Sequence, residues 1–274
     1  MKFSVLLSVY KNEKPEYLQV ALMSIVNQTL LPDEIVIVED GILTPGLDVV
    51  IQNFKDKYKN IVKLVPFKEN RGLGLALHDG VLACSYEYIA RMDTDDIALP
   101  KRFAKQLAYL KEHPDEAMVG SWITEFSKDA EHPDTITKLP YTYEDIVAYA
   151  KKRNPFRHMT VIYKKSAVID SGNYRDFLWF EDYDLWVRMI QKGYKVANIS
   201  EVLVNVRADD AMFARRCGWK YWKQDMRFQN ELYNSGFVCF EEMLLNCCIR
   251  FITRLLPKKA SLFVYKKFLR KMVS

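Results

Sequence analysis

Three carboxylates stand within four residues, at Asp93, Asp95 and Asp96, directly after the mostly apolar run 88–92. In an open α/β sheet a buried strand is a short apolar run, and ligands bind where such strands end. Anions this close repel one another unless a cation lies between them, and hard oxygen ligands suit Mg²⁺ or Mn²⁺. The spacing therefore predicts a strand that delivers carboxylates to a divalent metal. The alternative is an acidic loop in which Asp96 caps the next helix, with Pro100 near its first turn.

A second acidic group, Glu181, Asp182 and Asp184, opens a segment in which apolar residues recur at helical spacing. The periodicity predicts a helix that ends near Gly193. Acidic residues in the first turn of a helix are favoured by the helix dipole alone. On the sequence alone, stabilisation of the helix start and a chemical role both remain open for these carboxylates.

The elements that must position these groups alternate along the first part of the chain. We expect strands at 3–9, 34–38, 61–65 and 88–92, and helices at 15–28, 47–58 and 75–84. Strand and helix in this order predict right-handed βαβ units and a mostly parallel central sheet flanked by helices. The loop after the first strand contains no glycine, and no GxxxxGK[ST] loop occurs, which argues against a dinucleotide-binding fold and a P-loop.

The second part of the chain is less regular. Its patterns predict strands at 117–126 and 159–163, a helix at 143–152 and a short helix at 165–170 that ends at Ser171-Gly172.

Composition is that of an ordinary globular protein, with 49% hydrophobic and 27% charged residues among 274. The five cysteines show no CxxC pairing, so we expect reduced thiols. A strand pattern begins almost at the first residue, and we therefore expect no signal peptide.

The net charge of +5 is unevenly placed. From Arg207 onward there are 14 lysines and arginines against 6 acidic residues, which predicts an anionic partner near the C-terminus. Residues 237–256 are mostly apolar, but charged residues interrupt them, so no stretch of about 20 uncharged apolar residues exists. With the basic segment 258–271, residues 237–274 predict an amphipathic tail on an anionic membrane surface. The alternative is packing on the body or on a second subunit, as in a homodimer. No nucleic-acid recognition motif is present.

Five motifs occur in a fixed order along the chain, at 4–10, 34–41, 70–74, 90–96 and 180–185, and together they resemble the motifs of one known family. From about Phe3 to Arg207 the chain resembles a family-2 glycosyltransferase of the GT-A fold, the group that builds bacterial capsule, exopolysaccharide and O-antigen chains. The resemblance implies a GT-A domain over 1–207, with a nucleotide-sugar half at about 1–100 and an acceptor half at about 101–207. Residues 208–274 would then form a basic amphipathic helical tail.

The resemblance also implies a donor site for a UDP-sugar. Val9, Tyr10 and Asn12 would line the base, and Asp40 would accept a hydrogen bond from uracil. Asn70, Arg71 and Gly72 would approach the nucleotide or its diphosphate. Asp93 would hold the ribose or the metal. Asp95, together with Asp93, would ligate the Mn²⁺ or Mg²⁺ that bridges the diphosphate.

For catalysis, the resemblance implies that Asp182 is the base that activates the acceptor hydroxyl, with Glu181 in reserve. His158 would face the acceptor, although a structural role is an open alternative, and Arg207 would lie near the diphosphate. Many relatives carry a histidine just after this arginine, whereas here Ala208 follows, which leaves a third metal ligand unassigned.

The implied activity is inverting transfer of a hexose or N-acetylhexosamine from a UDP-sugar to a lipid-linked saccharide at the cytoplasmic face of the bacterial inner membrane. Two alternatives are a nucleotide-sugar-binding module without turnover and a metal-dependent nucleotidyltransferase. A nucleotidyltransferase would not explain the Glu181-Asp182 pair. No residue indicates which sugar is donated.

Overall fold

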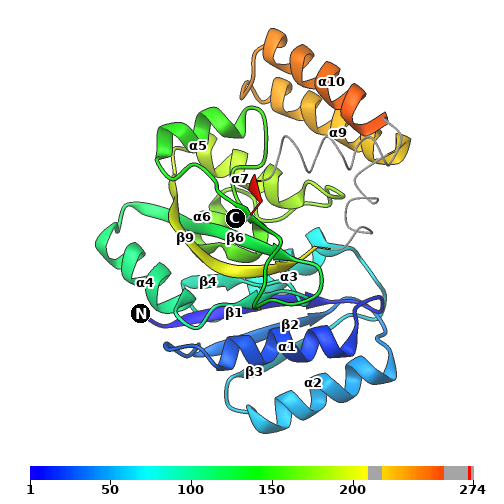
Figure 1. The fold of residues 1–274 in the computed structure, drawn as a ribbon, viewed down its shortest axis with the longest axis vertical. Coiled ribbons are helices and arrows are strands. Elements are labelled where there is room, and N and C mark those ends of the chain that lie inside the picture. The colour runs from blue at the N-terminus through cyan, green and yellow to red at the C-terminus, as the bar shows by residue number, and fades with distance from the viewer. Residues whose placement is uncertain (209–217, 256–270, 273–274) are drawn as a thin grey trace.

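The structure is a computed structural model that describes residues 1–208, 218–255 and 271–272. A mixed sheet runs through the molecule, with helices on both of its faces (Figure 1). Its strands are β1 Phe3–Val9, β2 Glu34–Glu39, β3 Val62–Pro66, β4 Tyr88–Arg91, β5 Ile97–Ala98, β6 Glu116–Phe126, β7 Thr135–Thr137, β8 Ile162–Lys164, β9 Lys195–Arg207 and β10 Lys271–Met272. Its helices are α1 Pro15–Val26, α2 Pro45–Lys57, α3 Leu73–Ala83, α4 Arg102–Glu112, α5 Tyr143–Ala150, the 3₁₀ turn η1 His158–Thr160, α6 Lys165–Asp170, α7 Glu181–Gln191, α9 Trp219–Asn234 and α10 Phe240–Leu255.

The first half of the sheet is parallel, as the alternation of strands and helices predicts. Its strands lie in the order β3-β2-β1-β4, and each neighbouring pair is parallel. The carboxyl ends of β1, β2 and β4 therefore meet at one edge of the sheet.

Beyond β4 the sheet is mixed, which differs from the expectation of a mostly parallel sheet. β8 lies between β4 and β6 and runs antiparallel to both, while β9 runs parallel to β6 and antiparallel to β5. Strands buried on both faces are continuous apolar runs whatever their direction, so the sequence carried no signal for this change.

The expected strand at 159–163 begins later than the sequence suggests. Residues 158–160 form the 3₁₀ turn, and the strand is Ile162–Lys164. The Thr160 hydroxyl donates to the Arg157 carbonyl at 2.8 Å and accepts from the Ser121 N–H at 3.2 Å. Local side-chain hydrogen bonds of this kind compete with the strand ladder and favour a turn.

Two apolar cores cover the two faces of the sheet because successive side chains of a strand point to opposite faces. Val5 and Leu7 of β1 pack with residues from α1, α2 and α4. Leu6 packs on the other face with residues from α3, α7 and α9.

A buried polar network fixes the end of β4 from behind. The Arg102 Nη2 donates to the Arg91 carbonyl at 2.7 Å, and the Gln106 amide donates to the Thr160 carbonyl at 2.7 Å and to the Val119 carbonyl at 3.1 Å. Both polar side chains are fully buried. Because buried polar groups are costly unless they are hydrogen-bonded, this network specifies one position for the strand end.

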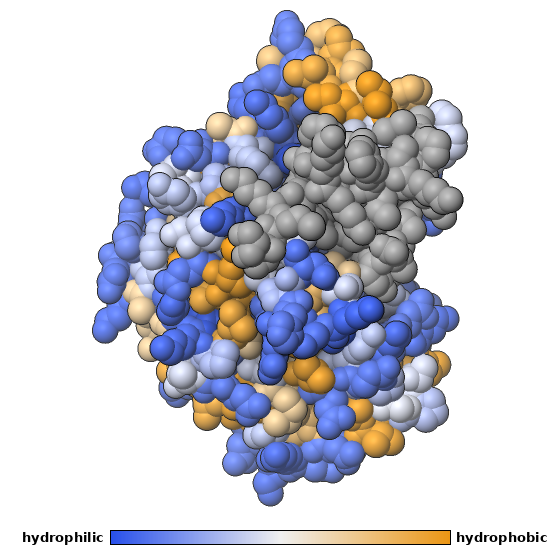
Figure 2. Space-filling model, viewed as in Figure 1, coloured by the Kyte–Doolittle hydropathy of each residue, from blue (hydrophilic) through white to orange (hydrophobic). Residues whose placement is uncertain are grey.

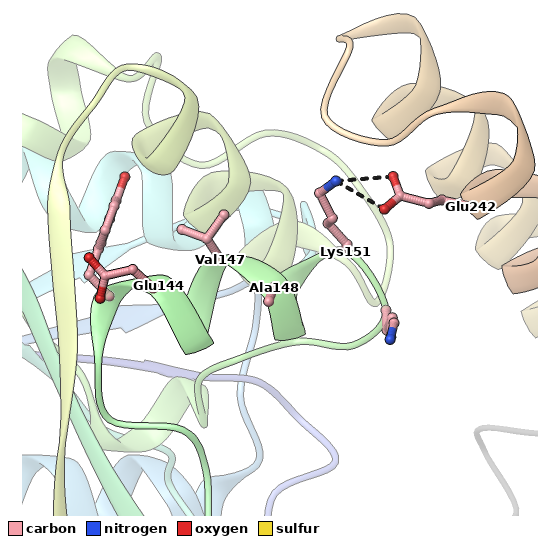
Figure 3. A pocket seen from close by; sticks show the side chains of 7 residues that line it. Glu144, Val147, Ala148, Lys151 and Glu242 are labelled. Carbon is pink, nitrogen blue, oxygen red and sulfur yellow. Dashed lines mark hydrogen bonds and ion pairs between the residues drawn. The ribbon is translucent and has the colours of Figure 1, made fainter.

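The helices α9 and α10, called the C-terminal hairpin below, stand at the end of the molecule near α5 and α7 (Figure 1). A groove of about 580 Å³ lies between α5 and α10, and the ion pair of Lys151 with Glu242 spans it at 2.9 Å (Figure 3). Residues 209–217 and 256–270, which include most of the expected basic segment, fall outside the described residues. Lys271–Met272 is not helical and pairs antiparallel with β7.

Hydrophobic side chains gather on the outer face of α10 (Figure 2). The exposed ones are Phe240, Leu244, Leu245, Ile249, Phe251 and Ile252. Within the described residues, no helix combines the length and the apolar character needed to cross a bilayer.

Gly74 allows α3 to approach the segment that leads into α7. A Cβ at this position would lie 2.2 Å from the Arg175 carbonyl oxygen and 3.4 Å from the Glu181 Cβ. A backbone carbonyl cannot move aside as the end of a side chain can. The absence of a side chain at Gly74 therefore sets the distance between the starts of α3 and α7.

We predict that Gly74→Ala lowers the free energy of unfolding by about 1–3 kcal/mol, although alanine raises intrinsic helix propensity by about 1 kcal/mol. Gly80→Ala in the same helix is the matched comparison, because the Cβ there would meet the movable Leu6 Cδ1 at 2.5 Å. Urea unfolding of both variants measures the difference. A Gly74→Ala variant as stable as the wild type would contradict the close approach.

Candidate active site

The acidic loop after β4 is held by the last residue of β4 and by two other parts of the chain. The Asp93 carboxylate pairs with the buried guanidinium of Arg91. The Thr94 hydroxyl donates to the Glu13 carboxylate at 2.6 Å, and Asp96 accepts the Arg207 backbone N–H at 2.9 Å. These contacts place the loop beside the carboxyl end of β1 and the end of β9.

Asp96 is not a helix cap, which corrects the simpler interpretation of this loop. The residue before α4 is Lys101, and Asp96 is buried, with 1% of its surface exposed. One of its oxygens, Oδ2, is buried without a hydrogen-bond partner among the described residues.

The carboxylates of this loop repel one another. Burial, and then the charges of Asp93 and Glu13, raise the pKa of Asp95 to about 7. Burial, and then Asp95 and Asp93, raise the pKa of Asp96 well above its ordinary value. A bound cation would relieve this repulsion by favouring the ionised carboxylates.

The donor atoms fit a metal that is shared with a substrate. Within the described residues, no three Asp, Glu, His or Cys side chains form a complete metal site. Mg²⁺ at phosphate-binding sites usually takes only one or two carboxylates from the protein, and substrate phosphates and water complete its shell. Asp93 and Asp95, beside the unpaired oxygen of Asp96, meet that smaller requirement.

At the end of β2, Asp40 connects two loops. Its carboxylate accepts the Arg71 N–H at 2.7 Å, the Asn70 side-chain amide at 2.8 Å and the Gly72 N–H at 3.1 Å. A carboxylate has about four acceptor positions. One position therefore remains for a ligand, and the predicted contact with uracil stays a prediction.

The other residues expected at the base lie at or just after the end of β1, which pairs with β2. The Val9 carbonyl accepts the Asp40 N–H at 2.8 Å. Tyr10 is 41% exposed, and Asn12 lies in the exposed turn that follows β1. The predicted contacts of these three residues with the base stay predictions.

Arg71 and Gly72 contribute in different ways to the start of α3. The Arg71 guanidinium pairs with Asp79 at 2.7 Å and lies over the Phe67 ring, so its backbone N–H, and not its charge, contacts Asp40. Gly72 has a φ of 87°, and a Cβ there would meet nothing within 4 Å among the described residues. A left-handed glycine with open space at a helix N-terminus allows close approach of an anion.

The two carboxyl groups at the start of α7 have different surroundings. Glu181 is 8% exposed, and burial, followed by the charge of Asp182, raises the pKa of Glu181 to about 8. Asp182 accepts the Asn154 side-chain amide and the Tyr183 N–H, each at 2.7 Å. Neighbouring carboxyl groups in such different environments can divide acid and base roles between them.

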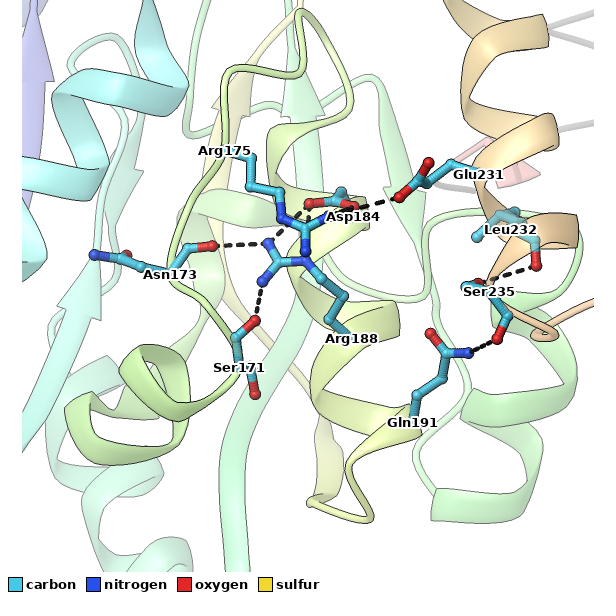
Figure 4. A network of polar contacts seen from close by, with 9 residues as sticks. All are labelled: Ser171, Asn173, Arg175, Asp184, Arg188, Gln191, Glu231, Leu232 and Ser235. Atoms are coloured by element: carbon cyan, nitrogen blue, oxygen red, sulfur yellow. Dashed lines mark hydrogen bonds and ion pairs between the residues drawn. The ribbon is translucent and has the colours of Figure 1, made fainter.

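Asp184, the third acidic residue of this group, is structural. It pairs with Arg188 at 2.8 Å and with Arg175 at 3.8 Å (Figure 4). Arg188 also donates to the Asn173 carbonyl at 2.7 Å. Asp184 therefore fixes the loop before α7, and its ion pairs give it a structural role that differs from the role expected for Asp182.

In the structure, the side chains of His158 and Arg207 contact aromatic side chains of the protein itself. The His158 Nε2 lies 2.9 Å from the Tyr174 hydroxyl, and burial, followed by the charge of Arg91, lowers the pKa of His158 well below its ordinary value. The Arg207 guanidinium lies over the Tyr17 ring, 3.9 Å from its centroid. The predicted contacts of these residues with acceptor or diphosphate stay predictions.

Sequence reasoning missed three residues of the site. Glu13 lies next to the acidic loop, Arg91 neutralises Asp93, and Asn154 contacts Asp182. Glu13 lies in the polar loop after the first strand, where a further carboxylate could have been noted. For Asn154, no signal in the sequence indicates its partner.

Comparison with known proteins agrees with this geometry. Residues 4–170 match the family model described as Glycosyl transferase family 2. The chain is 41% identical over 270 residues to the amylovoran biosynthesis glycosyltransferase AmsE of Erwinia amylovora, which covers 97% of this chain and 98% of that protein. It is 34% identical over 272 residues to the UDP-Gal:alpha-D-GlcNAc-diphosphoundecaprenol beta-1,3-galactosyltransferase of Escherichia coli, covering 99% of this chain and 98% of that protein.

Among solved structures, S. aureus TarS 1-349 in complex with UDP-GlcNAc matches with a TM-score of 0.67 at 17% identity, covering 98% of this chain and 77% of that chain. A likeness at this identity shows the fold, and the expected GT-A fold is confirmed. The family match and the full-length relatives show more: the chain belongs to glycosyl transferase family 2 and is a glycosyltransferase.

Proposed function

We propose that the chain moves a hexose or N-acetylhexosamine from a UDP-sugar to a lipid-linked saccharide, with inversion, in the synthesis of a bacterial surface polysaccharide. The observation that carries the proposal is that the acidic start of α7 packs against the start of α3, next to the turn that Asp40 binds. A Cβ at Gly74 would lie 3.4 Å from the Glu181 Cβ, and the Asp40 carboxylate accepts the backbone N–H groups of Arg71 and Gly72 just before α3. The E. coli relative, named for a UDP-Gal donor and a diphosphoundecaprenol-linked acceptor, supports this choice of substrates.

On the donor side, Asp93 and Asp95 would hold Mn²⁺ or Mg²⁺. A divalent ion there supplies stabilisation of the negative charge on the departing diphosphate. The open backbone at Gly72 and the N-terminus of α3 would approach the same diphosphate. Asp40, with Val9 and its neighbours, would bind the uridine.

On the acceptor side, Asp182 removes the proton of the attacking hydroxyl. Glu181 keeps its proton at neutral pH, which avoids placing two negative charges side by side. Attack from the face opposite the diphosphate inverts the anomeric carbon. This division of roles also favours an enzyme over a nucleotide-sugar-binding module. Such a module would not need a carboxylate base positioned by a hydrogen bond from Asn154.

The exposed face of α10 supports a peripheral position at the cytoplasmic face of the membrane. Leu245 and Ile252 are about 60% exposed, at 59% and 60%, and Trp219 at the start of α9 is also 60% exposed. Aromatic and basic side chains beside an apolar helix face suit an anionic bilayer surface, and Lys220 and Lys223 of α9 are exposed. A second copy of the chain is the competing partner for this face.

We predict that Asp95→Asn lowers metal-dependent UDP release from a UDP-sugar by about 10²-fold or more, because one of two carboxylates for the metal is lost. The measurement is UDP release from UDP-glucose, UDP-galactose and UDP-N-acetylglucosamine with Mn²⁺ or EDTA. Asp56→Asn, on the exposed surface of α2, is the matched control. Because Asp95 is repelled by its neighbours, the variant should be at least as stable as the wild type. An active, metal-responsive Asp95→Asn variant would contradict the assignment.

We predict that Glu181→Gln changes how stability depends on pH. The folded pKa of about 8 exceeds the ordinary 4.5, so the native state binds more protons than the unfolded state between these values. The stability contributed by Glu181 is therefore full below about pH 4.5 and is lost as pH rises towards 8. As pH rises through this window, the free energy of unfolding of Glu181→Gln relative to that of the wild type should increase by up to about 1.4 kcal/mol per pH unit. Urea unfolding between pH 5 and 8 tests this, and parallel curves would contradict the raised pKa.

We predict that the full chain binds vesicles containing anionic lipids and that the double variant Leu245→Ser/Ile252→Ser binds them several-fold less, because both exposed side chains lie on α10. Val49→Ser/Leu82→Ser, which removes exposed apolar residues from α2 and α3, is the control and should bind like the wild type. Vesicle sedimentation measures binding. Unchanged vesicle binding combined with loss of a dimer in sedimentation velocity would assign the face to a second copy.

A further inference from the structure

The C-terminal end of α5 is held by side chains from other helices. The last carbonyl groups of a helix have no partner within it and must be satisfied from outside. The Tyr183 hydroxyl donates to the Ala150 carbonyl, the Asn246 amide to the Lys151 carbonyl at 2.8 Å, and the Arg250 guanidinium to the Lys152 carbonyl at 2.9 Å. Two of these three donors come from α10, so the C-terminal hairpin fixes the end of α5.

The turn that follows α5 leads to Asn154, whose side chain is held at both ends. Its Oδ1 accepts the Phe156 N–H at 3.2 Å, and its Nδ2 donates to the Asp182 Oδ2 at 2.7 Å. Because the Phe156 N–H can only donate, it sets which end of the amide is oxygen. The donor end of Asn154 must therefore face Asp182.

The C-terminal hairpin is itself anchored by buried charge. Asp225 of α9 is fully buried and pairs with Arg250 at 2.6 Å and with Arg254 at 3.1 Å. Arg250 thus joins the Asp225 carboxylate to the Lys152 carbonyl. A buried charge that loses its partner is costly, so this joint keeps a single geometry.

The same hairpin also contacts the helix that carries Asp182 and the loop before that helix. Glu231 of α9 lies 3.6 Å from Arg175, and the Gln191 amide of α7 donates to the Ser235 carbonyl at 2.7 Å (Figure 4). On the α5 side, Lys151 reaches Glu242 across the groove (Figure 3). The hairpin therefore holds both the turn that carries Asn154 and the helix that carries Asp182.

We propose that Asn154 is a positioning residue for Asp182 and that the C-terminal hairpin belongs to the catalytic apparatus, because it fixes the turn from which Asn154 reaches that carboxylate. The inference rests on the proposed role of Asp182 as the base. A donated hydrogen bond fixes one carboxylate oxygen and favours the ionised form that can accept a proton. The acceptor hydroxyl can then use a remaining lone pair.

The titratable groups whose pKa is raised by the charge of Asp182 include Glu181 and Tyr183 on its own helix and Tyr174 on the preceding loop. All three are kept in the variants below. A change in pH profile between the wild type and Asn154→Asp is therefore read against unchanged charges at these three groups.

Asn154→Asp is the sharpest test because it keeps the size of the side chain and an acceptor for the Phe156 N–H, while an oxygen replaces the donor to Asp182. We expect kcat for UDP release at pH 7 to fall by about tenfold to a hundredfold. The acid limb of the kcat profile should move up by about one to two pH units, since Asp182 then holds its proton more tightly. KM for the UDP-sugar should stay within about twofold, because the donor site is unchanged.

Asn246→Ala tests the hairpin, because it removes the donor to the Lys151 carbonyl and leaves Asn154 in place. We expect a smaller shift of the acid limb in the same direction. Ser235→Ala is the matched control in the same hairpin, where the hydroxyl donates only to the Leu232 carbonyl among the described residues, and its profile should match the wild type.

The two claims fail separately. If wild-type chain releases no UDP from any of the three UDP-sugars with Mn²⁺, the proposed function fails. If the wild type turns over and Asn154→Asp binds UDP normally but keeps the wild-type acid limb, the positioning role is overturned. If only Asn154→Asp shifts, and Asn246→Ala matches Ser235→Ala, the role of the hairpin is overturned.

Discussion

Repulsion among the carboxylates at the end of β4 is the constraint on which the rest of the site depends. Asp93, Asp95 and Asp96 stand close together in partly or fully buried surroundings, and this raises the pKa of Asp95 and Asp96. The chain maintains this arrangement by placing the Arg91 guanidinium beside Asp93 and the Arg102 network behind the strand end. The proposed divalent ion, bound together with the diphosphate of a nucleotide sugar, would relieve this repulsion.

The proposed donor side and the proposed acceptor side of the site are built differently. On the donor side, parallel strands bring their carboxyl ends together, and Asp40 joins β2 to the start of α3. On the acceptor side, the order comes from side chains that join separate helices, with Asn154 and the C-terminal hairpin around Asp182. The proposed donor side therefore follows from the parallel strands, whereas the order around Asp182 depends on contacts from the C-terminal hairpin.

The sequence predicted the parallel strands, because buried apolar runs that alternate with helices are local patterns. The GT-A fold and the family came from the resemblance of five ordered motifs to family-2 glycosyltransferases. The sequence did not predict that β8 runs antiparallel, since a strand buried on both faces carries no sign of its direction. Contacts between distant residues were equally hidden: Thr94 binds Glu13 across 81 positions, and Asn154 binds Asp182 across 28. His158 stood out as a histidine near a strand, but only the fold shows that Tyr174 is its partner.

The most direct test of the central claim is calorimetry of UDP binding to the wild-type chain, with Mn²⁺ and with EDTA. If the acidic loop after β4 holds a metal that bridges the diphosphate, UDP binds tightly with Mn²⁺ and weakly or not at all with EDTA. Equal affinity under both conditions would contradict the account, because UDP would then bind without a metal held by the carboxylates of this loop.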